Sequence, residues 1–324
     1  MPSVAVVIPV KNGFPEIKAC IEGLLSQTVK IARILVIDSG STDGTLAYLR
    51  TIKEVELLEI DPADFNHGET RNIGWQHCTE EFLFYTVQDA RAANNSLLED
   101  LLKGFTDADV MAVCGQQVVP HEKDKNPVEW FRPLDTPRLL RYQFAQAGMF
   151  ESLTPAEKNS ICSWDDVVAM YRAAALRRIP FRRTVFGEDM IWAREAILAG
   201  YAIVYNQVAK VYHYHLENPA VSFKRNFTVM YSRYKQFGFI PPVPLLSIRK
   251  RLSVIKWLTR ALWPDIAGIL HWYLYNSKNF GAAINAHRQF MQALQQGETA
   301  LDNRHTELCG IPPTPLKATG GKHF

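Results

Sequence analysis

The chain of 324 residues has few cysteines, and their spacing gives them no evident structural role. The five cysteines are scattered and include no Cys-x-x-Cys pair. An odd, scattered set indicates reduced thiols in a cytosolic protein and argues against a disulfide framework. The sequence also lacks an uncharged apolar run of about 18 residues, so no membrane-spanning helix is expected. The apolar run at residues 4–10 contains a proline and has no basic residues before it, which excludes a signal peptide.

The chain carries little net charge, but that charge is unevenly distributed. A formal charge of +3 argues against a nucleic-acid-binding protein. Residues 218–264, however, hold nine Lys and Arg and no Asp or Glu, which predicts a basic surface in the C-terminal part. This surface is open to three interpretations: a solvated face, a face for an anionic membrane, or a contact between two subunits. Aromatic side chains are interleaved with the basic ones: Phe223, Phe227, Tyr231, Tyr234, Phe237, Trp257 and Trp263.

Apolar strand patterns alternate with helical patterns over the first 120 residues. Strands are expected at residues 4–10, 33–38, 55–60, 81–87 and 110–119. Helices are expected at residues 15–27, up to residue 50, at 68–78 and at 96–105. Strands that alternate with helices of about ten residues are typical of βαβ units. The sequence therefore predicts an α/β fold with a Rossmann-like, mostly parallel sheet flanked by helices.

The second half of the chain has a weaker pattern and ends in helices. It predicts helices at 137–147, 165–178, 188–199, 247–262 and 265–296, and short strands at 202–205 and 209–212. We therefore divide the chain into an α/β domain (1–217), a basic and aromatic helical extension (218–308) and a flexible tail (309–324).

Four polar clusters follow the first four expected strands: Lys11-Asn12-Gly13, Asp38-Ser39-Gly40, Asn66-His67-Gly68 and Gln88-Asp89. Ligands of parallel α/β sheets bind beyond the carboxyl ends of the strands. We therefore expect all four clusters to converge on one crevice.

Asp89 is a lone acid at a strand end, and His213 and His215 follow another strand. Together they suit Mg²⁺ or Mn²⁺ bridging a diphosphate, since such ions need few protein ligands. The alternative is that Asp89 caps a turn and the histidines lie on the surface. Glu188 and Asp189 also have two interpretations, a general base or simple acids at a helix start.

Two further side chains, those of Arg71 and Asp38, also have two interpretations each. Arg71 at a helix start suits a pyrophosphate or a base edge, or pairs with a nearby acid. Asp38 is either a turn residue or an acceptor for a pyrimidine N–H or a ribose.

Six motifs in order carry a family resemblance: VVIPVKNG, LVIDSGSTDGT, FNHGETRNIG, QDA, FGEDMIWAREAILAGY and VYHYH. Together they resemble family-2 glycosyltransferases of the GT-A type, and FNHGxTRN with QDA is most similar to bacterial dTDP-rhamnose-dependent rhamnosyltransferases of surface polysaccharide synthesis. The resemblance covers about residues 4–215, and it implies that residues 1–217 form a GT-A nucleotide-sugar-binding and catalytic domain.

The resemblance implies roles for particular residues. Gln88-Asp89-Ala90 stands where the wider family has Asp-x-Asp, so Asp89 and His213 are the implied metal ligands and Asp189 the implied catalytic base. The donor nucleotide and sugar are implied to contact a larger set: Pro9, Lys11, Asn12, Asp38, Ser39, Arg71, Gln88 and Asp166.

The resemblance also implies an enzymatic activity and a cellular location. It implies inverting transfer of L-rhamnose to a hydroxyl of a lipid-linked glycan, by a cytoplasmic enzyme that is peripheral on the inner face of the bacterial membrane. A homodimer is an open alternative for the basic extension. Other readings are a UDP-hexose or UDP-N-acetylhexosamine donor, or a non-catalytic nucleotide-sugar-binding module. The acids at 188 and 189 favour an enzyme.

Overall fold

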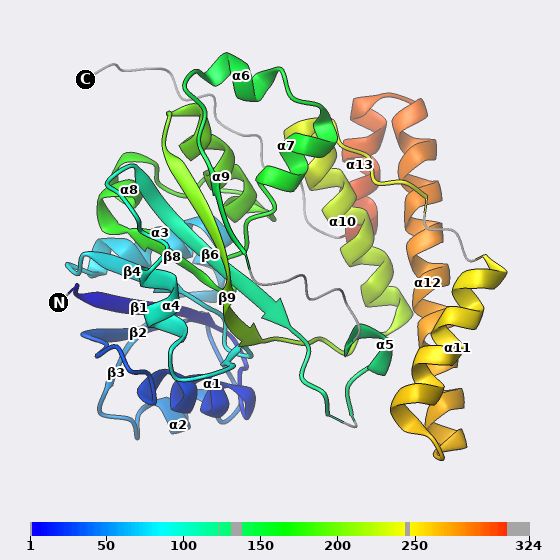
Figure 1. Cartoon of the computed structure of the whole chain (residues 1–324), viewed down its shortest axis with the longest axis horizontal. Coiled ribbons are helices and arrows are strands. Elements are labelled where there is room, and N and C mark those ends of the chain that lie inside the picture. Colours follow the sequence, from blue (N-terminus) through cyan, green and yellow to red (C-terminus); the bar gives the residue numbers. More distant parts are fainter. Residues whose placement is uncertain (1, 123, 131–137, 244–246, 310–324) are drawn as a thin grey trace.

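The computed structural model describes residues 2–122, 124–130, 138–243 and 247–309. Within these ranges the strands form a nine-stranded sheet of order β3-β2-β1-β4-β8-β6-β9-β5, with β7 paired to β9 (Figure 1). The strands are β1 Val4–Val10, β2 Arg33–Asp38, β3 Val55–Glu59, β4 Phe82–Tyr85, β5 Arg91–Ala92, β6 Val110–Val118, β7 Leu139–Tyr142, β8 Ala169–Arg172 and β9 Ala202–Tyr212. The α/β class with a helical C-terminal extension is confirmed.

The first half of the sheet follows the prediction closely. Strands β1, β2, β3 and β4 pair in parallel, each linked to the next by a crossover. Strands β1, β2 and β4 are mostly buried apolar runs, whereas β3 is the edge strand and has no fully buried residue. The connecting elements are α1 Glu16–Leu25, α2 Thr45–Leu49, a 3₁₀ turn Pro62–Asp64 and α3 His67–His77, and α4 Leu97–Leu102 follows β4 and β5.

The second half of the sheet is mixed, and three predictions there are wrong. Residues 165–178 were expected to be helical, but Ala169–Arg172 form β8, antiparallel to β4 and β6, and only Ala173–Arg178 form a helix, α8. In place of a helix at 137–147 the described residues contain β7. The two strands expected at 202–205 and 209–212 are one strand, β9. Its buried Asn206 donates to the Asp100 carbonyl at 2.6 Å, so the polar residue does not end the strand.

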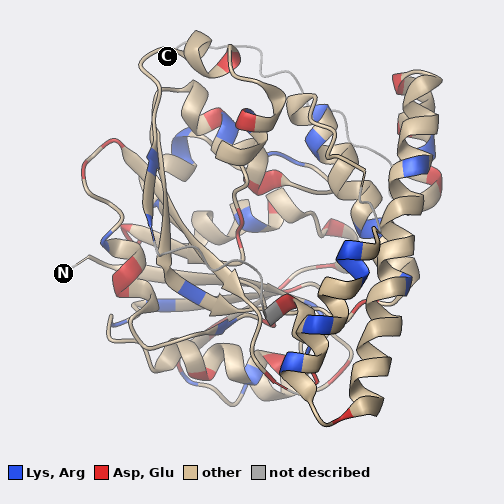
Figure 2. Cartoon of the chain, turned by 45° about the vertical axis from the view of Figure 1, so that its right-hand side comes forward, with Lys and Arg blue, Asp and Glu red and all other residues tan. Residues whose placement is uncertain are grey.

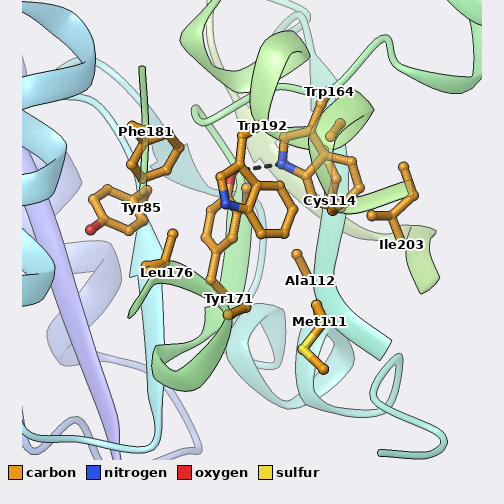
Figure 3. Packing of buried hydrophobic residues seen from close by; sticks show 14 of the residues in the cluster. Tyr85, Met111, Ala112, Cys114, Trp164, Tyr171, Leu176, Phe181, Trp192 and Ile203 are labelled. Atoms are coloured by element: carbon orange, nitrogen blue, oxygen red, sulfur yellow. Dashed lines mark hydrogen bonds between the residues drawn. The ribbon is translucent and has the colours of Figure 1, made fainter. Parts of the chain in front are cut away.

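Two apolar layers cover the faces of the sheet. Successive residues of β1 point alternately into the two layers. Val4 and Val6 pack in the first layer, toward α1 and α4. Ala5 and Val7 pack in the second layer, toward α8 and α9 Glu188–Leu198. The second layer is rich in aromatic rings, and Figure 3 shows Trp192 and Trp164 packed around Tyr171. This layer lies behind the acidic residues described below.

The C-terminal helices share a core of their own. It contains Phe227, Tyr231, Phe290 and Leu301, which come from α10 Pro219–Phe237, α12 Ile266–Gln295 and α13 Glu298–Cys309. Helix α11 Ile248–Leu262 packs beside α12 and against α5 Pro127–Trp130. The remaining helices are α6 Ala147–Glu151 and α7 Pro155–Ile161.

The domain boundary at 217/218 stays a prediction, and the predicted tail from residue 310 onward lies outside the described residues. None of the described helices is both long and apolar enough to span a bilayer.

Gly68 allows the chain to close around the start of α3. A Cβ on Gly68 would lie 2.0 Å from the carbonyl oxygen of Arg182. Side chains of Asn66 and Asn72 bond to the same segment, at the Thr184 and Phe181 carbonyls, each at 2.9 Å. The segment that leads into α9 is thereby fixed beside α3.

We expect Gly68→Ala to destabilise the protein by about 2–3 kcal/mol, because backbone must move to admit the methyl group. The matched control is Gly281→Ala, at an exposed site in α12 with no atom within 4 Å. That change should be neutral or stabilise by about 0.5–1 kcal/mol. Urea unfolding followed by circular dichroism measures both, and equal midpoints for the two variants would contradict the packing argument.

Candidate active site

A cavity of about 820 Å³ opens at the carboxyl ends of the parallel strands. Most of the predicted site residues line it: Pro9, Lys11, Ser39, Arg71, Gln88, Asp89, Asp166, Asp189 and His213. The expected convergence of the strand ends is therefore found, and Asp89 and Asp189 face one cavity although 100 residues separate them. Helices α10 and α12 complete the wall.

Gln88 links the loop after β1, which contains Lys11, to the end of β4 by two hydrogen bonds. Its Oε1 accepts a hydrogen bond from the Lys11 backbone N–H at 2.8 Å, and its Nε2 donates to the Lys11 carbonyl at 3.2 Å. A carboxylate could accept the first bond but could not donate the second. This two-way bond gives a structural reason for Gln at the position where the wider family has an acid.

Asn12 and Asp38 are predicted site residues that lie behind the lining. Asn12 has a positive φ of 51° and accepts from the Thr42 N–H through Oδ1 at 2.8 Å. Asp38 is buried, and its Oδ1 accepts from the N–H groups of Gly40 and Ser41. Its Oδ2 is buried without a hydrogen-bond partner among the described residues. Asp38 therefore has one acceptor oxygen in reserve.

Asp89, His213 and His215 form a compact cluster of possible metal ligands. Their ligand atoms lie within 4.8 Å of one another, and each histidine has one nitrogen 3.4 Å from an Asp89 oxygen. Burial opposes ionisation of Asp89, but the two histidines outweigh it, and the pKa of Asp89 is lowered. An ionised carboxylate between two imidazoles is a donor set that a divalent cation fits.

Gln117 orients His213 and was missed by the sequence analysis. Its Nε2 donates to Asp165, so its Oε1 faces His213 Nδ1 at 2.6 Å and acts as the acceptor. With Nδ1 bonded to Gln117, Nε2 is the nitrogen of His213 that faces Asp89, 3.4 Å from its Oδ1. That Nε2 is buried and has no hydrogen-bond partner within the described ranges. Such an outer hydrogen bond fixes the tautomer that a metal-binding histidine requires.

Arg71 is buried among acids. Its Nε lies 2.7 Å from Asp166 and its Nη1 lies 2.7 Å from Glu188, and Nη1 also donates to the His67 carbonyl. Asp166 accepts a further bond from the Tyr171 hydroxyl. The guanidinium therefore ties α3 to the segment before β8 and to the start of α9. The predicted contact of Arg71 with base or pyrophosphate stays a prediction.

Asp189 stands at the start of α9 with its carboxylate beside these groups. Its Oδ1 accepts from the Met190 N–H at 2.7 Å, and its Oδ2 lies 3.4 Å from the Asp166 backbone nitrogen. Burial, followed by the charges of Glu188 and Asp166, raises the pKa of Asp189 well above the usual 3.8. Burial likewise raises the pKa of Asp166 to about 7, although Arg71 opposes the shift. A carboxyl with a raised pKa is suited to accept a proton near neutral pH.

Comparison with models of known protein families gives a match for this chain. The model of glycosyl transferase family 2 matches residues 5–179, more than half of the sequence. The chain belongs to glycosyl transferase family 2. It is therefore a glycosyltransferase, and the matched residues run from β1 into the loop that follows α8.

Curated relatives in the family are similar over about 70% of their own length. The O-antigen chain rhamnosyltransferase WbaN of Salmonella anatum is 32% identical over 70% of this chain and 71% of its own. The O-antigen chain rhamnosyltransferase RfbN of Salmonella typhimurium is 29% identical over 69% of this chain and 70% of its own.

Solved structures share the fold at lower identity. A mannosyltransferase of Pyrobaculum calidifontis, PcManGT, in complex with GDP-Man and Mn²⁺, superposes with a TM-score of 0.54 and 19% identity over 94% of this chain and 79% of its own. Residues 1–349 of S. aureus TarS, in complex with UDP-GlcNAc, superpose with a TM-score of 0.52 and 13% identity. That superposition covers 91% of this chain and 92% of the TarS chain. These likenesses establish the GT-A fold.

We expect Asp89→Asn and His213→Ala to weaken Mn²⁺ binding by about 10-fold or more, because each removes one of the few protein ligands. Electron paramagnetic resonance of free Mn²⁺ gives the affinity without an activity assay. His77→Ala, which changes an exposed histidine on α3, serves as control. Wild-type affinity in both cluster variants would remove the metal assignment.

Proposed function

We propose that this protein is an inverting rhamnosyltransferase that transfers L-rhamnose from dTDP-β-L-rhamnose to a hydroxyl of a lipid-linked glycan in the synthesis of O-antigen or another surface polysaccharide. One observation carries the chemistry: the Asp89 cluster and Asp189 line the same cavity. The similarity to two O-antigen chain rhamnosyltransferases supports the donor sugar and the pathway class.

The donor nucleotide is proposed to bind over the ends of β1 and β2. Ser39 and Lys11 line the cavity there. Ser39 is proposed to contact the pyrimidine and the ribose, and Asp38 to support that contact from behind the lining, where its Oδ1 holds the N–H groups of Gly40 and Ser41.

The diphosphate is proposed to lie at Asp89, His213 and His215. A divalent cation held by these residues would stabilise the negative charge that develops on the departing diphosphate. Two imidazole ligands favour Mn²⁺ over Mg²⁺, which prefers oxygen.

Asp189 is proposed as the general base. Its carboxylate takes the proton of the acceptor hydroxyl as the oxygen attacks the anomeric carbon. The new C–O bond forms on one face of the sugar while the bond to the diphosphate breaks on the other, and the diphosphate leaves with the electron pair. Burial, followed by the surrounding acids, raises the pKa of Asp189 and so makes its carboxylate basic enough for this task.

The extension is proposed to bind an anionic membrane through an exposed apolar face of α11 and α12. Four aromatic side chains of α10 pack in the helical core, namely Phe223, Phe227, Tyr231 and Tyr234, and Phe237 packs in the second layer of the sheet, so none of them is available to a membrane. Exposed apolar residues instead form a stripe along α11, its end and the first half of α12: Ile248, Leu252, Ile255, Trp263, Ile266, Leu270 and Leu274. Figure 2 shows Lys and Arg along α11. Residues 247–297 hold seven Lys and Arg and one acid, Asp265.

This charge pattern favours lipid over a second copy of the chain. A symmetric dimer through the same face would bring two basic helices together, and like charges repel. Anionic headgroups instead attract the basic side chains while the apolar stripe enters the headgroup region.

We expect Asp189→Asn to bind dTDP-rhamnose with wild-type affinity and to lower turnover by about 10²-fold or more. Release of dTDP by slow donor hydrolysis measures turnover, because water replaces the unidentified acceptor. The wild-type rate should fall as the pH falls through the raised pKa of Asp189, well above the usual 3.8, since only the ionised carboxylate accepts a proton. UDP-glucose and UDP-N-acetylglucosamine serve as comparison donors. Unchanged turnover in Asp189→Asn would overturn the base assignment.

We expect the double variant Leu252→Glu, Leu270→Glu to lose binding to vesicles that contain phosphatidylglycerol by about 10-fold or more, because two apolar contacts are lost and two acids are added. Sedimentation with phosphatidylcholine vesicles alone gives the electrostatic contribution. Met149→Glu, at an exposed residue of α6, is the control. Equal sedimentation with both kinds of vesicle would count against the membrane surface.

A further inference from the structure

One face of α10 forms a wall of the cavity. The residues of α10 that line it are Ser222, Arg225, Val229 and Arg233, and their spacing of three and four residues places them on one side of the helix. The opposite side, with Phe227 and Tyr231, packs in the helical core. Two arginines on a rigid helix therefore face the space in which the substrates meet.

The two arginines differ in their partners. Arg225 forms an ion pair with Glu217. Arg233 forms no ion pair or side-chain hydrogen bond with any described residue, and its Nε is buried. Burial alone lowers the pKa of Arg233, because no acid lies close enough to oppose it. The acids of the cavity are engaged elsewhere, with Asp166 and Glu188 held by Arg71.

A half-buried cation without a counter-charge is unfavourable for folding, so its presence in a substrate cavity calls for an anionic ligand. A guanidinium binds carboxylate or phosphate through parallel hydrogen bonds, and phosphate is the anion that the proposed substrates carry. The proposed donor and a lipid-linked acceptor both carry phosphate, and the position of Arg233 distinguishes them.

Helix α10 touches the start of α9 at the residue next to Arg233. The preceding residue, Ser232, is packed against Gly187: a Cβ on that glycine would lie 2.8 Å from the serine Oγ. Gly187 directly precedes Glu188 and Asp189, the proposed base. The donor diphosphate has its own partners at Asp89 and His213, at the ends of β4 and β9.

We propose that Arg233 binds the phosphate of the acceptor, so that α10 recognises the lipid-linked diphosphate while Asp189 receives the proton of the sugar that it carries. This inference rests on the proposed transfer to a lipid-linked glycan, and it adds an acceptor subsite to that proposal.

The test compares Arg233→Met with Lys224→Ala, which removes an exposed charge from the same helix. Inorganic pyrophosphate is titrated calorimetrically with EDTA present, so that the metal-dependent donor site is silent. Arg233→Met should bind pyrophosphate about 10- to 100-fold more weakly than the wild type, the factor expected for one charge-assisted hydrogen bond. Lys224→Ala should bind like the wild type.

Two further measurements separate the sources of the phosphate. Farnesyl diphosphate, a short lipid diphosphate, should lose affinity in parallel with pyrophosphate, whereas dTDP with Mn²⁺ should bind equally to all three proteins. A loss of dTDP affinity by the same factor would assign Arg233 to the donor and overturn the proposal. Absence of dTDP binding in every protein would sink the proposed function, and the EDTA titration would still decide the role of Arg233.

Stability gives the remaining control. A ligand-binding Arg233 has no partner to lose, so Arg233→Met should melt at the wild-type temperature or above it. Arg233→Lys keeps the charge and should retain part of the pyrophosphate affinity. A marked loss of stability in Arg233→Met, or unchanged pyrophosphate affinity, would show that the arginine acts within the fold and not on a ligand.

Discussion

The cavity depends on one buried cation, the guanidinium of Arg71. It bonds to Asp166 before β8 and to Glu188 at the start of α9, and so joins three segments that are far apart in sequence. Removing the guanidinium would leave two buried carboxyl groups without their cation, which is far more costly than the ion pairs themselves are stabilising. The position of Asp189 beside these acids follows from that constraint, and so does its raised pKa.

A second set of contacts holds the donor side. Gln88 and Asn12 are amides, and each bonds to the backbone of another loop, at Lys11 and Thr42. Amides can make these bonds without adding charge to the cavity beside the cluster of Asp89, His213 and His215. The residue that departs from the wider family's acidic pair thus has a role in shaping the loop.

The sequence predicted the parallel strands well, because β1 and β2 are continuous apolar runs and their ends carry polar clusters. The order of the motifs also predicted that Asp89 and His213 would lie in one site. The prediction failed at β8, where Ala169 and Met170 have no strong strand preference and the strand state comes from pairing with β4 and β6. Gln117 and Arg233 gave no local signal at all, since their roles arise from neighbours that lie far away in sequence.

Helix α10 belongs to two environments at once, with aromatic rings on one side and the cavity on the other. The strand-end loops that form the proposed nucleotide site lie on a different support, the parallel half of the sheet. Substitutions that tilt or slide α10 would therefore change the proposed acceptor site at Arg233 more than the loops at Lys11 and Ser39, which are not attached to that helix. His213 and His215 lie between β9 and α10 and would link such a movement to the proposed metal site.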